Sequence, residues 1–226
     1  MSRSLVAASL TLGLLAGVPA SGLAGGIEVR GGGFAPRAQS NLFSDVSELY
    51  NVDKKDWAGG SGGIEFSMKL VPNLELGFHV DGYHRTLDSH YRDYTRDSGR
   101  EISQALELSV VPVGVSLRLV PTSRHARLAP YATVGADLFY YRYEEYGEFI
   151  DFHTPGLDIS SDSFISEGVA PGFHVAGGLR VPIGPVFAFT GEVRYQWAKT
   201  DMPDDFRENK IDLSGAGVTL GMLFRF

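Results

Sequence analysis

The final stretch of the chain, Val218 to Phe226, constrains the fold more than any other. Its apolar side chains fall on one face of a period-2 strand, namely Val218, Leu220, Met222, Phe224 and Phe226. Chain termini normally fray into water unless something holds them. An apolar strand that closes on an aromatic residue therefore predicts an apolar environment around it, and a lipid bilayer supplies one.

A terminal Phe preceded by apolar residues at every second position resembles the closing strand of bacterial outer-membrane β-barrels. The resemblance is sharpest over 218–226, extends loosely along the chain, and favours the small barrels of the OmpA/OmpX type. It implies that the barrel assembly machinery reads this ending as a signal, with Phe226, Phe224, Met222 and Leu220 as the residues that carry it.

Residues 1–24 have the composition of a secretory signal peptide. Arg3 supplies the positive start, an apolar run extends from Leu5 to Val18, and Ala20 or Ala24 can precede cleavage, with Ala24 preferred. A transmembrane anchor is the alternative, but the run is shorter than the ~20 residues that a spanning helix needs. The chain has no Cys, which excludes a lipoprotein anchor and disulfides. We expect residues 25–226 to form one exported domain.

The charge of the chain bears on its partners. The formal net charge is −7, and removal of residues 1–24 takes away one basic residue, Arg3, and no acidic one. An acidic chain is a poor partner for nucleic acid, so nucleic-acid binding is not expected.

Alternating apolar and polar residues predict eight strands, which makes the fold class all-β. The links between them are short after the second, fourth and sixth strands and longer after the first, third, fifth and seventh, where they cover 36–58, 88–101, 144–169 and 200–209. An even strand number with alternating short and long links is typical of outer-membrane barrels whose termini are periplasmic. The predicted strands are 26–34, 64–70, 74–83, 105–119, 132–143, 173–181, 187–197 and 218–226.

Strand 105–119 departs from a simple alternation. Its apolar residues are even-numbered before Pro112 and odd-numbered after it. A β-bulge at Pro112, which inserts one residue and restores the outward face, is the expected cause.

Alternation alone does not say which face of a barrel points inward. A soluble lipocalin-like barrel or a sandwich would bury the apolar face. The signal peptide, the terminal Phe and aromatic residues near strand ends, such as Tyr140, Tyr195 and Trp197, favour the inverted arrangement with a lipid-facing apolar exterior. The prediction is an eight-stranded antiparallel up-and-down transmembrane β-barrel.

In that arrangement the polar faces line the lumen. Eight strands leave a lumen only wide enough for side chains, and buried charges persist only when paired. We therefore expect a network of ion pairs in place of a hydrophobic core, and no conducting pore. The residues expected inside are Glu28, Arg30, Glu65, Lys69, Glu75, Asp81, Glu107, Arg118, Asp137, Arg180, Glu192 and Arg194.

Residues with chemical potential are few. His79, Asp81 and His84 are weak catalytic candidates, because no nucleophile and base can be paired from the sequence. The acidic stretch 144–169 lacks the regular ligand spacing of a calcium loop, so no metal and no cofactor are expected. Arg92, Arg96 and Arg100 are suited either to lipopolysaccharide phosphates or to the aspartates beside them.

The sequence thus predicts a monomeric integral outer-membrane protein with a non-enzymatic role in envelope structure or surface interaction. Expected partners are outer-membrane lipid, lipopolysaccharide and the assembly machinery. The alternatives are an outer-membrane lipid-modifying enzyme and a narrow pore for a small solute.

Overall fold

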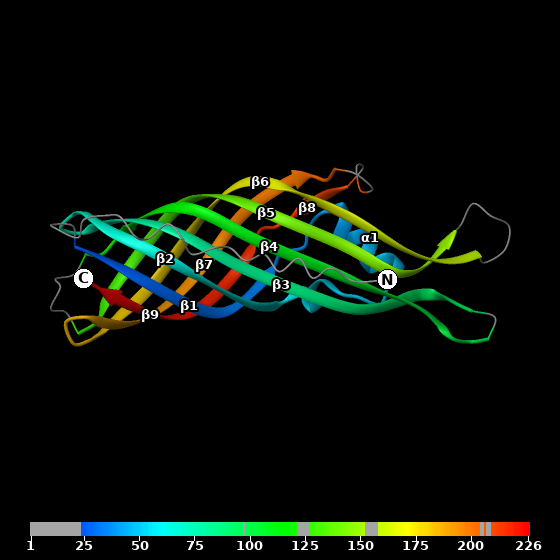
Figure 1. Cartoon of the computed structure of the whole chain (residues 1–226), viewed down its shortest axis with the longest axis horizontal. Helices are drawn as coiled ribbons and strands as arrows, with labels where there is room; N and C mark the ends of the chain where they lie inside the picture. Colours follow the sequence, from blue (N-terminus) through cyan, green and yellow to red (C-terminus); the bar gives the residue numbers. More distant parts are fainter. Residues whose placement is uncertain (1–23, 97, 122–126, 152–157, 204–205, 207–208) are drawn as a thin grey trace, which may run out of the picture.

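Eight antiparallel strands close into a ring in the computed structural model, which describes residues 24–96, 98–121, 127–151, 158–203, 206 and 209–226 (Figure 1). Each strand pairs with its neighbours in sequence, and β1 pairs with both β2 and β9. A short strand, β8 (Lys210–Asp212), pairs with the end of β7 outside the ring. The eight-stranded barrel predicted from the sequence is confirmed. Its strands are β1 (Gly25–Pro36), β2 (Gly59–Val71), β3 (Leu74–Thr95), β4 (Glu101–Leu119), β5 (Ala129–Asp151), β6 (Asp158–Ile183), β7 (Phe187–Asp201) and β9 (Gly215–Arg225).

The two ends of the barrel differ. At one end, here called the terminal end, Gly25 and Phe226 exchange two backbone hydrogen bonds of 3.1 Å. The opposite end, here called the distal end, carries the hairpins β3–β4 and β5–β6, which project beyond the ring (Figure 1). The predicted signal peptide, residues 1–24, lies outside the described residues except for Ala24.

The distal hairpins correct the predicted loops 88–101 and 144–169. Strand β3 continues to Thr95, and β5 and β6 remain paired as far as Asp151 and Asp158. Many of the side chains there are polar, but the backbone N–H and C=O groups are satisfied by the ladder whatever the side chains are. Side-chain polarity was therefore a poor indicator of where the strands end.

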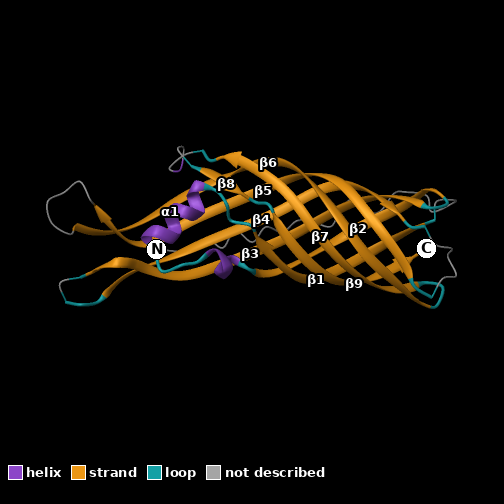
Figure 2. Ribbon diagram, turned by 180° about the vertical axis from the view of Figure 1, so that it is seen from behind, coloured by secondary structure: helices purple, strands orange, loops and turns teal. Residues whose placement is uncertain are grey.

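The predicted loop 36–58 is also corrected, because it contains a helix and a 3₁₀ turn. Helix α1 (Asn41–Leu49) buries Leu42, Phe43 and Val46 on one face, and η1 (Lys54–Trp57) buries Trp57. Figure 2 shows α1 at the distal end of the barrel. None of the described helices is both long and apolar enough to cross a bilayer.

An apolar belt surrounds the barrel between its terminal end and its middle. The outward side chains of this belt are large and apolar, and they are far more exposed than a soluble surface tolerates; Leu220 is 73% and Val193 is 60% exposed. Hydrocarbon is the solvent that suits such a belt. Its members include Ile64, Phe78, Val115, Leu138, Val175, Val193, Leu220 and Phe224.

Strand β4 contains no bulge, contrary to the prediction at Pro112. Its register with β5 is unbroken, from Leu119 opposite Ala132 to Gln104 opposite Gly147. Odd-numbered residues point outward along the whole strand. What changes at Pro112 is which of the two faces is apolar. Before Pro112 the interior is apolar and buries Leu106 and Leu108, whereas after it the exterior is apolar.

The belt makes a quantitative prediction at Val193 on β7. Val193→Arg places a charge in lipid near the middle of the belt and should lower the free energy of unfolding by about 2–4 kcal/mol. Urea unfolding of the protein in lipid vesicles, followed by tryptophan fluorescence, measures it. Ser103→Arg is the control, because Ser103 is exposed on the outer face of β4 beyond the belt. Equal losses in both variants would contradict the assignment of the belt.

Candidate functional site: the filled lumen

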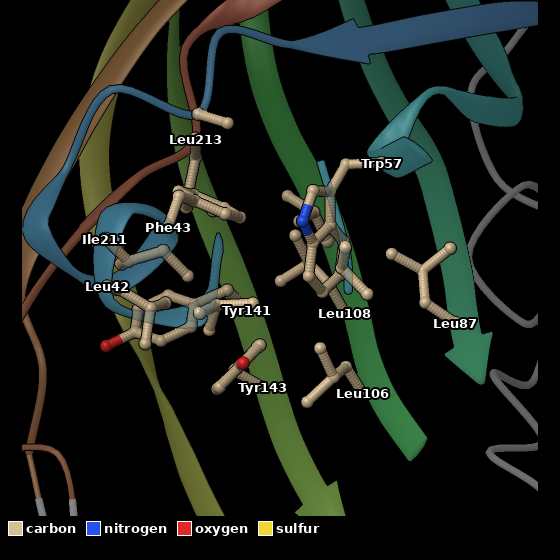
Figure 3. Close-up of a cluster of buried hydrophobic side chains, with 14 of the residues drawn as sticks. Leu42, Phe43, Trp57, Leu87, Leu106, Leu108, Tyr141, Tyr143, Ile211 and Leu213 are labelled. Carbon is tan, nitrogen blue, oxygen red and sulfur yellow. The ribbon is translucent and has the colours of Figure 1, made fainter. Parts of the chain in front are cut away.

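The lumen is divided into a charged compartment and an apolar compartment. The charged compartment fills the barrel within the apolar belt and consists of Glu28, Arg30, Glu65, Glu75, Asp81, Arg118, Arg180, Glu192 and Arg194. The apolar compartment lies at the distal end and includes Leu42, Phe43, Trp57, Leu106, Leu108, Tyr141, Tyr143, Ile211 and Leu213 (Figure 3).

Arg30 connects β1 to β3 across the lumen. Its Nε and one terminal nitrogen donate to the two carboxylate oxygens of Asp81, at 2.8 and 2.6 Å, and its other terminal nitrogen donates to Glu65 at 3.2 Å. A bidentate guanidinium–carboxylate pair is the strongest of the charge-assisted arrangements. The Arg30 side chain is 2% exposed, so the guanidinium is almost completely withdrawn from solvent.

Arg118 of β4 occupies the middle of the charged compartment. One of its terminal nitrogens lies 2.8 Å from Glu65, and carboxylate oxygens of Glu28 and Glu192 lie within 3.7 Å of the guanidinium. The guanidinium also stacks over the Tyr131 ring, 4.6 Å from its centroid. A single guanidinium is therefore shared by carboxylates from three strands.

Arg194 and Arg180 complete the charged compartment. Arg194 donates to Asp81 at 2.9 Å and to Glu192 at 3.1 Å, while Arg180 donates to both oxygens of Glu75 at 3.2 and 3.1 Å. Lys69 lies with Glu75 and Arg180 around a cup of about 640 Å³ at the terminal end.

The structure places one predicted lumen residue elsewhere. Glu107 lies on the outer surface of β4, where its carboxylate is 3.8 Å from the His84 ring. The prediction failed because it took the apolar parity of β4 before Pro112 as the outward one. The other predicted lumen residues lie on the inward face of the barrel.

The three candidate catalytic residues are not brought together. His79 is buried beside Asp137, Asp81 is bound by two arginines, and His84 is on the outer surface with its side chain 60% exposed. The structure instead joins His79 with Asp137 and His174. The sequence placed Asp137 on the inward face, but its contact with His79 and His174 depends on the registers of β3 through β6.

The apolar compartment corrects the expectation that ion pairs replace a hydrophobic core throughout. Phe43 of α1 packs edge-on against Trp57, with ring centroids 5.5 Å apart, and β5 contributes the buried rings of Phe139, Tyr141 and Tyr143. Figure 3 shows side chains of α1, η1, β4 and β5 converging on one cluster. Segment 36–58 thus closes the distal end as a plug.

The carboxyl group of Glu145 lies inside this distal cluster. It accepts hydrogen bonds from Tyr143 at 2.7 Å and from Tyr50 at 3.4 Å. Burial raises the pKa of Glu145 above its ordinary value, and the two tyrosine hydroxyls oppose this shift only in part.

The arginines of the β3–β4 hairpin make contacts that the sequence did not indicate. Arg96 and Arg100 lie 2.7 and 3.7 Å from Glu148 of β5, and Arg92 donates to the carbonyl oxygens of Ser47 and Tyr50 at the end of α1. They link the two projecting hairpins and the helix, and the neighbouring Asp97 lies outside the described residues.

A closed eight-stranded barrel with a charged lumen and an apolar belt defines the fold of the small outer-membrane β-barrel proteins. The outer-membrane protein OprG from Pseudomonas aeruginosa is similar, with a TM-score of 0.53 and 13% identity over 90% of this chain and 97% of that one. A major outer-membrane protein from Thermus thermophilus has a TM-score of 0.50 and 13% identity over 91% of this chain and 100% of that one. No family model and no curated protein sequence matches the chain. At these identities the similarity establishes the fold alone.

The charged compartment predicts a large effect of removing Arg118. Arg118→Met leaves the carboxylates of Glu28, Glu65 and Glu192 without their shared cation and should lower the free energy of unfolding by about 3–5 kcal/mol. The double variant Arg118→Met/Glu65→Gln removes one of the three carboxylates that lose this cation and should recover part of the loss. Urea unfolding in lipid vesicles measures both, and strictly additive losses would contradict the proposed coupling.

Glu145 predicts a pH dependence of stability. The folded-state pKa of Glu145 is raised above the ordinary value of 4.5. The protein is therefore most stable below pH 4.5 and loses stability as the pH rises through the raised pKa. Glu145→Gln should abolish this loss and be more stable than the parent at neutral pH, with the difference shrinking in acid. Tyr143→Phe removes a donor to the carboxylate and should steepen the loss. Unfolding midpoints across the pH range test this, and parallel profiles for all three proteins would refute it.

Proposed function

We propose that the protein is an integral outer-membrane protein with a non-enzymatic role in envelope structure or surface interaction. In this proposal the barrel is a closed anchor that holds the distal hairpins and α1 at the cell surface. The observation that carries it is that the lumen is filled in both of its compartments.

The filling argues against transport. In the charged compartment Arg30 and Arg118 are 2% and 1% exposed, and each is held by carboxylates from other strands. In the apolar compartment Leu106 and Phe139 are fully buried. A solute would have to separate buried ion pairs and then displace a packed hydrophobic cluster, and both steps are costly.

The proposed orientation places the terminal end in the periplasm and the distal end outside. Short turns face the periplasm and longer connections face outward in outer-membrane barrels, and the short β2–β3 and β6–β7 turns lie at the terminal end. Outer-membrane lipid and lipopolysaccharide are the proposed surroundings of a monomeric barrel. Phe226 points outward beside Phe66 and Phe224, in a position from which the assembly machinery would read it.

The distal structure is suited to present a fixed surface. The ion pair between Arg96 and Glu148 joins the two hairpins, and the bonds from Arg92 hold the end of α1. Tyr50 and Tyr91 add a backbone bridge and an edge-to-face ring contact. A preordered surface loses little conformational entropy when it binds a partner.

A second candidate, hydrolysis of an outer-leaflet lipid, is favoured by one contact. The Nδ1 atom of His84 is 2.9 Å from the Ser109 hydroxyl, just beyond the apolar belt. However, Glu107 approaches the same Nδ1 atom, at 3.8 Å. A catalytic triad requires the hydroxyl and the carboxylate on opposite ring nitrogens, so the arrangement seen here favours an ordinary surface hydrogen bond.

One set of measurements tests the proposal. The purified full chain in planar lipid bilayers should show no unit conductance, and a tag inserted after Gly147 should be reached by antibody on intact cells. The protein should release no fatty acid from outer-membrane lipid, and Ser109→Ala should behave identically. Open channels would support a pore, and a lipid hydrolysis lost in Ser109→Ala would establish the enzyme; either result overturns the proposal.

A further inference from the structure

Three side chains inside the barrel stand apart from the arginine network. His79 of β3, Asp137 of β5 and His174 of β6, here called the imidazole–carboxylate cluster, point inward with side chains 0–2% exposed. The closed-anchor function proposed above does not require this cluster.

Charge distinguishes Asp137 from the other carboxylates of the lumen. Those of Glu28, Glu65, Glu75, Asp81 and Glu192 each lie within 4.0 Å of a guanidinium. Within the described part of the chain, no Lys or Arg nitrogen comes that close to Asp137, whose neighbours are two imidazoles. A buried carboxylate needs a balancing positive charge. The options are a proton on one imidazole and a cation that all three groups bind.

The geometry of the cluster favours the cation. Nε2 of His79 is 2.9 Å from Oδ1 of Asp137, yet neither atom makes an aligned hydrogen bond with any of the described residues. Nδ1 of His174 is 2.6 Å from the other carboxylate oxygen, and the two rings are nearly perpendicular with centroids 5.1 Å apart. The potential ligand atoms of the three residues all lie within 4.8 Å of one another. The three side chains therefore bring their ligand atoms together in one small space.

We propose that His79, Asp137 and His174 bind one divalent transition-metal ion, with Zn²⁺ as the best match. Ligand atoms at 2.0–2.1 Å from a tetrahedral Zn²⁺ lie about 3.3 Å from one another, a spacing within the spread of the cluster. Two imidazoles and one carboxylate suit zinc, whereas calcium and magnesium prefer oxygen ligands alone.

Glycines on the neighbouring strands make room for the cluster. A Cβ atom at Gly135 would overlap the His174 ring, and one at Gly114 would overlap the Asp137 carboxylate. The barrel wall beside both ligands therefore consists of backbone atoms alone, which leaves space for the two side chains.

The test uses Co²⁺ as a spectroscopic probe on the full chain. The protein is folded into detergent micelles with Co²⁺, desalted, and checked for folding by its heat-modifiable migration on a gel. We expect about one Co²⁺ per chain with the intense visible absorption of a tetrahedral site, and displacement of the ion by Zn²⁺. His174→Ala and Asp137→Asn should weaken binding by at least about 100-fold, since even the loss of groups that only orient ligands costs 10–100-fold.

His90→Ala is the matched control, because it removes a histidine of β3 that pairs with Glu101 outside the cluster. It should retain the Co²⁺ stoichiometry and absorption of the parent. A folded parent protein that retains no Co²⁺ overturns the proposal and assigns the balancing charge to a proton. Equal binding by the parent and His174→Ala also overturns it. The parent result decides the question even if a variant fails to fold, and His79→Gln provides a further variant of similar size.

Discussion

The guanidinium groups of Arg30, Arg118 and Arg194 hold the barrel together from within. An eight-stranded ring has space for side chains and little else, and every strand in the belt presents its polar face to that space. The charges must therefore neutralise one another across the lumen, which joins strands that are not neighbours in the sheet. Arg30 on β1 reaches Asp81 on β3, and Arg194 on β7 reaches the same carboxylate. Cross-lumen pairs thus provide the tertiary contacts that a hydrophobic core provides in a soluble barrel.

The need to pair charges inside the barrel ends at the distal edge of the apolar belt. Beyond the belt the exterior is polar, so the interior becomes apolar and is closed by α1 and η1. Strand β4 shows the transition most clearly, because its inward residues change from Arg118 and Ser116 to Leu108 and Leu106 without any change of register. One continuous barrel wall thus separates a charged interior from lipid at one end and an apolar interior from water at the other.

The sequence was sufficient to predict the barrel strands, but not the side chains and segments that fill the lumen. Alternation located the eight barrel strands, because lipid and lumen impose opposite polarities on neighbouring side chains. It misassigned Glu107, because the apolar residues of β4 face inward before Pro112 and outward after it. It missed α1, because a nine-residue helix with Asp45 and Glu48 among its apolar residues looks like a polar loop. Parity placed Asp137 inside, but its meeting with His79 and His174 depends on the registers of three strand pairs, which no local pattern contains.

The closure between Gly25 and Phe226 bears on how this fold forms. The ring is completed by pairing β1 with β9, which lie at opposite ends of the described sequence. Until they meet, the sheet has two open edges whose backbone groups cannot be satisfied in hydrocarbon. Contacts of such long sequence separation are slow to form, because loop closure costs entropy before any contact repays it. No partial barrel is a stable resting state in the membrane, so strand pairing and insertion have to proceed as one cooperative event.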